Sequence, residues 1–232
     1  MAKQYAVIGL GKLGKEVVEW LSRKGHQVMA IDKRRDRVEE ISVNVDNSLS
    51  FDTTSETALL DARIDGMDVV VCAIGDDHIQ DSIMTTALLK KIGVKKIIAR
   101  ASTDLHANIL KVVGAHDVIN PEKEMGDKIA QKIVAPGLFE IFPIAEGAAI
   151  AELEVPKSFV GKNIIELRIR SRYGVNVIGV RRLAPESEPP PEGEEPERKF
   201  IINFKPEDTL QPGDILVIAG TEETVKKIAE IE

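Results

Sequence analysis

Cysteine and aromatic residues are scarce in this sequence, which has one cysteine, one tryptophan and two tyrosines among 232 residues. A single cysteine excludes an internal disulfide and suits a reducing compartment. Cys72 lies in the apolar run Val69–Ile74, where a cysteine packs as a small hydrophobic residue. No run approaches the roughly 18 apolar residues that a membrane-spanning helix needs. The N-terminal residues lead at once into an expected strand at Tyr5, so no signal peptide is expected.

Basic residues are outnumbered by acidic ones, 31 to 38, and the formal net charge is −7. A general nucleic-acid-binding protein needs a basic face that displaces counterions, so no nucleic-acid partner is expected. Hydrophobic residues make up 43% of the chain, which is enough for a packed core. An acidic protein of this kind remains able to dock on a basic surface of another protein.

The first half of the sequence alternates short apolar runs with amphipathic stretches. The runs are rich in Val and Ile, as buried parallel strands are. One helix carries Leu13, Val17, Trp20 and Leu21 at helical spacing, and another carries Ile79, Ile83, Ala87 and Leu88. This alternation predicts an α/β fold, a doubly wound parallel sheet of the Rossmann type, over residues 1–121. The expected strands are Tyr5–Ile8, Gln27–Ile31, Asn47–Phe51, Val69–Ala73, Lys96–Ala101 and His116–Ile119.

Residues 122–140 are expected to form a helix and a linker. Met125, Ile129 and Ile133 form one stripe of the helix, and Ala135-Pro136-Gly137 ends it. The stripe would pack either on the preceding sheet or against another lobe or another copy of the chain.

A second, smaller α+β domain is expected over residues 141–232. Its first strand carries Ala151, Leu153 and Val155 in alternation, a helix runs from Ser158 to Ser171, and Thr221 caps a final helix. The segment 184–198 is dominated by Pro and Glu, which predicts a mobile, solvated loop; an acidic docking arm is the alternative. The other expected strands are Val175–Val180, Phe200–Phe204 and Ile215–Ala219.

A glycine-rich motif follows the first expected strand and opens the first helix. The residues are Gly9-Leu10-Gly11-Lys12-Leu13-Gly14, a G-x-G-x-x-G pattern in the context where it binds nucleotides. Gly9 permits the tight turn, Gly11 lets phosphate approach the backbone, and Gly14 lets the helix press on the strand. The helix N-terminus adds unpaired amides and a partial positive charge.

An acidic residue at the end of the second strand completes this signal. Asp32 stands about 20 residues after the motif, where a carboxylate binds both ribose hydroxyls. It disfavours a 2′-phosphate by charge repulsion, so NADP is not expected. Lys12 either reaches a terminal phosphate, which favours ATP or ADP over NAD, or is simply an exposed lysine. Lys33, next to Asp32, is assigned to the same site.

Further residues of the nucleotide site are expected where later strands end. Asp52, followed by Thr53, either meets the adenine amino group or caps the next helix. Ala73, Ile74 and Gly75 follow the fourth strand at the switch region of the sheet, where the small residues leave room for a ligand. Arg100, at the end of the fifth strand, either reaches a phosphate or pairs with a local acid.

Catalytic machinery is not evident beside this site. His26 and His116 precede strands, while His78 and His106 lie at helix starts, where solvated roles are expected. The sequence has no Tyr-x-x-x-Lys pattern, no nucleophile elbow and no Cys/His spacing typical of a metal site. A sensor is therefore favoured over an enzyme, with an NAD-dependent oxidoreductase and a nucleotide-binding scaffold as alternatives.

Four segments of the sequence resemble the RCK (KTN) domain of potassium-uptake regulators of the Ktr and Trk type. They are residues 5–14, Ala30-Ile31-Asp32, Val70–Gly75 and Val118–Gly126, the last containing the specific stretch Asn-Pro-Glu-x-x-Met-Gly. The C-terminal part resembles the RCK C-terminal (TrkA-C) domain through Val160-Gly161-Lys162, Tyr173–Ile178 and Leu210–Asp214. The resemblance covers essentially the whole chain. It departs from the family at the acidic loop after Arg182 and at Lys12, where relatives carry an arginine that meets the ATP γ-phosphate.

The resemblance implies a regulatory subunit rather than an enzyme. It implies homodimers assembled into an octameric ring that sits at the inner face of the cell membrane, in the cytoplasm, against a membrane potassium transporter subunit. ATP and ADP, or NAD and NADH, would favour different ring shapes and so switch the transporter.

Two further ligands follow from the same resemblance. Glu122 matches an acid that, paired across the dimer, holds Mg²⁺ or Ca²⁺, with Glu124 as the alternative. Some relatives bind cyclic di-AMP in the C-terminal domain, at positions matched by Ile164, Ile165, Arg170 and Asn176.

Overall fold

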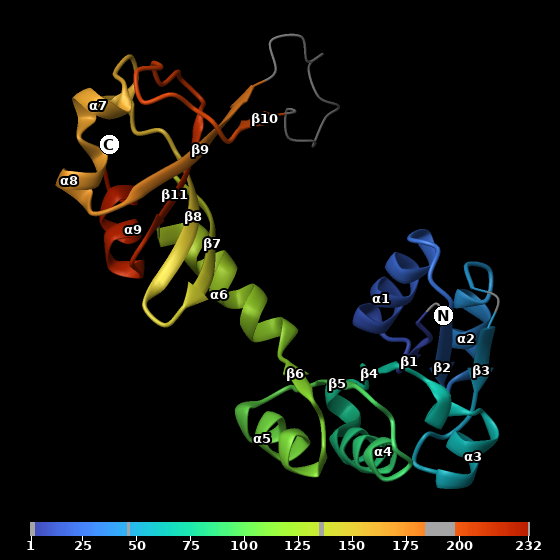
Figure 1. Cartoon of the computed structure of the whole chain (residues 1–232). Coiled ribbons are helices and arrows are strands. Elements are labelled where there is room, and N and C mark those ends of the chain that lie inside the picture. The colour runs from blue at the N-terminus through green and yellow to red at the C-terminus, as the bar shows by residue number, and fades with distance from the viewer. Residues whose placement is uncertain (1–2, 46, 135–136, 184–197, 232) are drawn as a thin grey trace. The chain divides into compact units, whose positions relative to one another are not determined.

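The computed structural model describes residues 3–45, 47–134, 137–183 and 198–231, and these fall into two compact units, Met1–Glu124 and Met125–Glu232. Figure 1 shows their elements. The division falls inside the helix α6 (Pro121–Val134). The expected mobile loop, 184–198, lies almost wholly outside the described residues. Within the described residues, no helix combines the length and the apolar character needed to cross a bilayer.

The first unit is built on a parallel six-stranded sheet in the order β3-β2-β1-β4-β5-β6. The chain runs outward from the centre to β3 and then returns to start again at β4, the strand order of a dinucleotide-binding fold. The expected parallel sheet is confirmed. Its strands are β1 (Tyr5–Ile8), β2 (Val28–Asp32), β3 (Asn47–Ser50), β4 (Val69–Cys72), β5 (Ile97–Arg100) and β6 (Asp117–Ile119).

Helices cover both faces of this sheet. On one face Val18 and Ile41, from α1 and α2, pack on Val7 and Ala30. On the other, Leu59 and Leu89, from α3 and α4, pack on the opposite side of the same strands. The helices are α1 (Lys12–Arg23), α2 (Arg35–Ile41), α3 (Glu56–Asp61), α4 (Ile79–Lys91) and α5 (Asp104–Val113), with short 3₁₀ turns at Ile64–Gly66 and Asp76–His78.

The buried face of α4 differs from the expected apolar stripe. Ser82, Thr85, Thr86 and Leu89 are buried, whereas Ile79 is 38% exposed. Small hydroxyl residues let this helix lie close to the sheet, and the Thr85 hydroxyl is 2.9 Å from that of Thr53. The prediction of an Ile-based core face was therefore wrong at Ile79, because hydropathy alone does not rank small polar residues as packing groups.

The second unit holds an antiparallel five-stranded sheet in the order β10-β9-β11-β8-β7. Leu153, Leu216 and Ile218 of the sheet pack with Val225 and Ile228 of the last helix. As expected, Thr221 caps that helix by accepting a bond from the Thr224 amide, 3.2 Å. The elements are β7 (Leu138–Ala145), β8 (Ala148–Glu154), α7 (Ile164–Leu167), α8 (Ile169–Tyr173), β9 (Asn176–Leu183), β10 (Arg198–Ile201), β11 (Ile215–Gly220) and α9 (Glu222–Ala229).

The single helix expected from Ser158 to Ser171 is wrong. The segment forms a 3₁₀ turn at Lys157–Phe159 and two short helices that meet at Arg168. Arg168 has φ of 49°, in the left-handed region, and a residue there breaks the helical hydrogen-bond ladder. The sequence pattern also failed to indicate the strand β7, half of whose residues are exposed.

Candidate functional site

One cavity of the first unit lies where the strands of the parallel sheet end. Its volume is about 680 Å³. The carboxyl ends of β1 and β4 meet here at the point where the strand order reverses, the usual ligand position in such sheets. The lining residues are Ile8, Gly9, Gly11, Lys12, Asp32, Lys33, Arg34, Arg37, Asp52, Thr53, Ala73, Ile74, Gly75, Asp76, Asp77, His78, Asp81 and Arg100.

The glycine-rich loop forms the floor of this cavity. Gly9 has φ of +91°, and a side chain there would lie 2.9 Å from the backbone of Ala73 and Ile74. A Cβ on Gly14 would collide with the Gly9 carbonyl oxygen, whereas a Cβ on Gly11 would meet no atom within 4 Å. Two glycines therefore serve the close packing of strand and helix, while Gly11 leaves open space beside the first amides of α1.

Asp32 ties this loop to the second strand. Its carboxylate is buried, 6% exposed, and accepts hydrogen bonds from the Leu10 amide at 2.7 Å and the Arg34 amide at 2.8 Å. Arg37 Nη1 also lies 3.3 Å from Asp32 Oδ2. The acid thus fixes the loop conformation in addition to facing the cavity, and Arg37 lines the cavity beside it.

Ion pairs within the cavity wall neutralise most of its cations. Lys33 pairs with Asp81 at 2.9 Å, and the hydrogen bond from Lys33 to Asp81 raises the pKa of this lysine. Arg34 pairs with Asp36, and Arg37 with Asp32. Within the described residues Lys12, at the start of α1, forms no ion pair. A phosphate entering the cavity would therefore meet Lys12 and the helix N-terminus without first breaking an ion pair.

Asp52 does not cap the following helix, so that alternative was wrong. The cap of α3 is Ser55, which accepts from the Ala58 amide. Asp52 accepts instead from the hydroxyl and the amide of Thr54, at 2.7 and 2.9 Å, and these bonds lower its pKa. The carboxylate therefore stays ionised at the cavity wall, where it can accept a hydrogen bond from an amino group.

Arg100 joins the cavity to the start of α6. Its guanidinium Nη2 lies 3.2 Å from Asp76 Oδ1 and 2.6 Å from Glu122 Oε1, and the side chain is 16% exposed. The Ser102 hydroxyl donates to the same Asp76 oxygen at 2.6 Å. Two residues assigned separately from sequence, one to phosphate and one to a metal ion, are thus bound to each other.

Sequence reasoning missed the cavity residues that follow the strands on helical turns. Arg34, Arg37, Asp76, Asp77, His78 and Asp81 all line the cavity. A search for charged residues in the loop and the first helical turn that follow the second and fourth strands would have found them. Conversely Leu10, Leu13 and Gly14 of the motif do not line the cavity. Leu10 and Gly14 are buried, and Leu13, on α1, packs against the core on that face of the sheet.

The candidate residues of the second unit fall in two places. Ile164, Ile165 and Arg170 line one shallow hollow together with Arg168, Ile169 and Ser171. Asn176, at the start of β9, is exposed and does not line it. In the described part of the chain, no three His, Cys, Asp or Glu side chains are grouped as a metal site would require.

Comparison with known proteins gives consistent matches along most of the chain. The TrkA-N domain model matches residues 5–121. Ktr system potassium uptake protein C of Bacillus subtilis is 30% identical over 221 residues, which cover 95% of this chain and 93% of that protein. Ktr system potassium uptake protein A of Vibrio alginolyticus is 32% identical, covering 95% and 94%. The solved RCK domain of GsuK shares the fold, with a TM-score of 0.67 at 18% identity; all of this chain matches 48% of that one.

Proposed function

The chain belongs to the TrkA-N domain family, together with the Ktr system potassium uptake proteins A and C, and from this premise we propose a nucleotide-binding regulatory subunit of a potassium uptake system. The observation that carries the proposal is the cavity at the end of β1, where a glycine loop is tied to Asp32. It occurs in a chain that matches Ktr system protein C of Bacillus subtilis over 95% of its length. The subunit acts at the cytoplasmic face of the membrane, against an integral membrane transporter subunit.

The cavity binds ATP or ADP in this proposal, with NAD and NADH as the alternative. Asp32 accepts hydrogen bonds from the ribose hydroxyls, and Asp52 accepts one from the adenine amino group. The phosphates lie beside Gly11 and extend toward Lys12. The remaining contacts come from the residues proposed from sequence that line the cavity, namely Gly9, Lys33, Thr53, Ala73, Ile74, Gly75 and Arg100. Binding switches the transporter without turnover, because ligands of different phosphate length favour different arrangements of the subunits.

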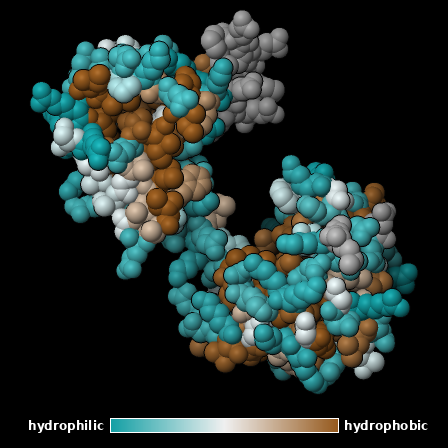
Figure 2. Space-filling view, in the orientation of Figure 1, coloured by the Kyte–Doolittle hydropathy of each residue, from teal (hydrophilic) through white to brown (hydrophobic). Residues whose placement is uncertain are grey.

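Homodimers that assemble into an octameric ring are part of the same proposal. Support comes from α6, on which no residue is buried. Met125, Ile129 and Ile133 are 56%, 53% and 73% exposed, and Figure 2 shows hydrophobic residues at the surface of both units. A stripe of this kind on one helix suits packing against a second copy of the chain.

Two accessory ligands belong to the proposal. Glu122 from each of two copies would hold Mg²⁺ or Ca²⁺, whose charge offsets that of the nucleotide phosphates. The hollow at Ile164, Ile165 and Arg170, with Asn176 nearby in sequence, would take cyclic di-AMP. The apolar side chains would contact the bases, while Arg170 would meet phosphate.

A titration with ATP, ADP, NAD and NADH tests the nucleotide site. The variant Asp32→Asn keeps the size of the side chain but loses the charge that binds the ribose. We expect the affinity for the preferred nucleotide to fall about tenfold or more, the value of a hydrogen bond to a charged group. Calorimetry provides the measurement, and retained protection of Cys72 from thiol reagents establishes that the variant is folded.

Unchanged affinities in Asp32→Asn would contradict this site assignment. Production of NADH from NAD and any substrate would instead favour the oxidoreductase alternative. A monomer at the concentration of the titration, measured by light scattering, would contradict the ring.

The Arg100–Glu122 ion pair gives a second prediction. In Glu122→Gln, Arg100 loses its nearer charged partner, at 2.6 Å, and keeps only Asp76, at 3.2 Å, so less carboxylate charge competes with phosphate for it. We therefore expect ATP to bind about twofold to fivefold more tightly in EDTA, because an ion pair with one exposed partner is worth about 1 kcal/mol at most. The effect of added Mg²⁺ on ATP affinity should disappear. The matched control Glu124→Gln should behave as the wild type; equal affinities in both variants would contradict competition for Arg100.

A further inference from the structure

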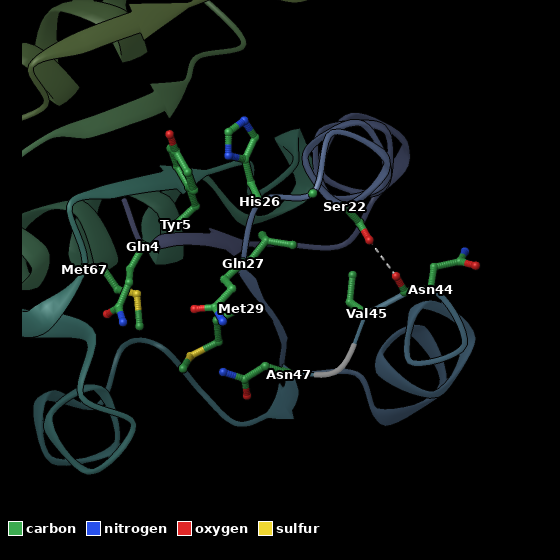
Figure 3. A pocket seen from close by; sticks show the side chains of 12 residues that line it. Gln4, Tyr5, Ser22, His26, Gln27, Met29, Asn44, Val45, Asn47 and Met67 are labelled. Atoms are coloured by element: carbon green, nitrogen blue, oxygen red, sulfur yellow. Dashed lines mark hydrogen bonds between the residues drawn. The ribbon is translucent and has the colours of Figure 1, made fainter. Parts of the chain in front are cut away.

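A second cavity lies at the opposite edge of the parallel sheet, where β1 and β2 begin, and its volume is about 470 Å³. Figure 3 shows it from close by. It is far from the strand ends that form the nucleotide cavity, and the two share no lining residue. The lining residues are Gln4, Tyr5, Ser22, Gly25, His26, Gln27, Val28, Met29, Asn44, Val45, Asn47 and Met67.

Three carboxamides form a row across this cavity on neighbouring strands. Tyr5 pairs with Val28, which sets Gln4 beside Gln27, and Met29 pairs with Asn47. Since side chains alternate between the faces of a strand, Gln4, Gln27 and Asn47 all project on the face of Met29. Neighbouring strands are about 4.8 Å apart, so Gln4 and Gln27 lie side by side. Asn47 stands opposite Met29, two residues further along the strand direction, so the row is staggered at Asn47.

Two methionines complete this side of the cavity. Met29 and Met67 are each only 8% exposed. Figure 3 shows Met67 with Gln4 on one side of the hollow, and Met29 with Gln27 and Asn47 on the other. Thioethers are polarisable and make favourable contacts with aromatic rings. The cavity therefore has an adaptable apolar floor under a row of polar groups.

The carboxamides are available to a ligand. Within the described residues, the side chains of Gln4, Gln27 and Asn47 make no hydrogen bond to the protein. Each offers a carbonyl oxygen that accepts and an amino group that donates. A complementary molecule needs both donors and acceptors along one edge and a flat apolar face for the methionines.

Phosphate-bearing ligands are disfavoured at this edge. None of the described residues that line the cavity is a lysine, arginine, aspartate or glutamate. The helices of the unit run antiparallel to the strands, so that α1, for example, ends here at Arg23 and directs its carbonyl groups toward this edge. Lys24, which follows the end of α1, is not among the lining residues of the cavity. Its ammonium lies instead over the Trp20 ring, 5.9 Å from the ring centroid.

We propose that this cavity binds an uncharged, planar nitrogen heterocycle, a free nucleobase or nucleoside, separately from the nucleotide cavity. The volume lies within the range of small-molecule sites. The row of amides reads the donor and acceptor edge of the base, and the two thioethers contact its face. The protein thereby has a second ligand-binding site, at which binding does not require a phosphate group.

Methyl NMR of the full chain labelled at methionine tests the proposal, with adenine, guanine, cytosine, uracil, their nucleosides and AMP as probes. We expect the Met29 and Met67 methyl signals to shift with at least one base or nucleoside, and more weakly with the corresponding nucleotide. The Met84 and Met125 signals should stay in place. The shifts should persist in Asp32→Asn, and Gln27→Leu should weaken the apparent affinity about tenfold.

Asn44→Leu is the matched control, because Asn44 lines the same cavity but is outside the row of three amides. It should leave the affinity within about twofold of the wild type, since no ligand contact is assigned to it. The proposal is overturned if no base or nucleoside shifts Met29 and Met67 at millimolar concentration. It is also overturned if AMP shifts them more strongly than adenosine, or if Asp32→Asn abolishes the response; that last result would assign the response to the nucleotide cavity.

Discussion

Replacement of Arg182 by alanine is expected to lower the free energy of unfolding of the second unit by about 3 to 5 kcal/mol. Asp214 is 1% exposed and accepts two bonds from the Arg182 guanidinium, at 2.9 and 2.6 Å, and one from the Gln211 amide at 2.8 Å. Arg182 also donates to the Thr209 carbonyl at 3.0 Å. Its removal leaves a buried carboxylate without a counter-charge, which is the costly half of a broken ion pair.

The two units can be followed separately in this experiment. Trp20 and Cys72 are the only tryptophan and cysteine of the chain, and both belong to the first unit. Urea unfolding followed by far-UV circular dichroism should show an early transition in Arg182→Ala, while Trp20 fluorescence and Cys72 labelling still report a folded first unit.

Arg181→Ala provides the matched control, because the neighbouring arginine bonds Glu152 at 2.7 Å from a side chain that is 41% exposed. Exposed pairs contribute roughly 1 kcal/mol or less, so this variant should unfold near the wild-type urea concentration. Equal destabilisation by the two substitutions would show that the buried carboxylate is not the cause.

Gly14→Ala is expected to disrupt the nucleotide cavity and to destabilise the first unit by about 3 kcal/mol, the upper end of the usual cost of overpacking. The added methyl would collide with the carbonyl oxygen of Gly9, and neither backbone segment can move without shifting β1 against α1. Cys72 is fully buried in the adjacent strand, and burial raises the pKa of its thiol. Faster labelling of Cys72 should therefore accompany the loss of stability.

Gly11→Ala separates packing from ligand binding. A methyl at Gly11 meets no protein atom within 4 Å, so the free energy of unfolding should change by less than about 1 kcal/mol. The methyl stands where phosphate would approach the backbone, and nucleotide affinity should still fall. Calorimetry and urea unfolding of both variants measure the two effects. A stable Gly14→Ala variant with wild-type affinity would contradict the packing role, and unaltered nucleotide binding by Gly11→Ala would contradict the phosphate path.

Nucleotide affinity and oligomeric state are linked in the proposed function. A ligand shifts an equilibrium between subunit arrangements only by the difference in its affinity for them. Arg100 is placed to produce such a difference, since it contacts Asp76 in the cavity wall and Glu122 at the first turn of α6. A phosphate that attracts Arg100 releases Glu122 at the start of α6. This is the helix that carries the exposed stripe Met125, Ile129 and Ile133.

The amino-acid sequence by itself determined the parallel sheet, the glycine loop and the position of Asp32. These features follow from short-range patterns, namely buried β-branched runs, a strand-to-helix turn that only glycine fits, and an acid at a strand end.

The tertiary structure alone decided the pairing of Arg100 with Glu122, the placement of Arg34, Arg37 and Asp81 in the cavity wall, and the row of carboxamides where β1 and β2 begin. Each of these joins residues that local periodicity does not connect, because register between strands and helix packing bring their side chains together. The same reason explains the buried hydroxyl face of α4 and the break at Arg168, where packing and backbone geometry outweighed the hydropathy pattern.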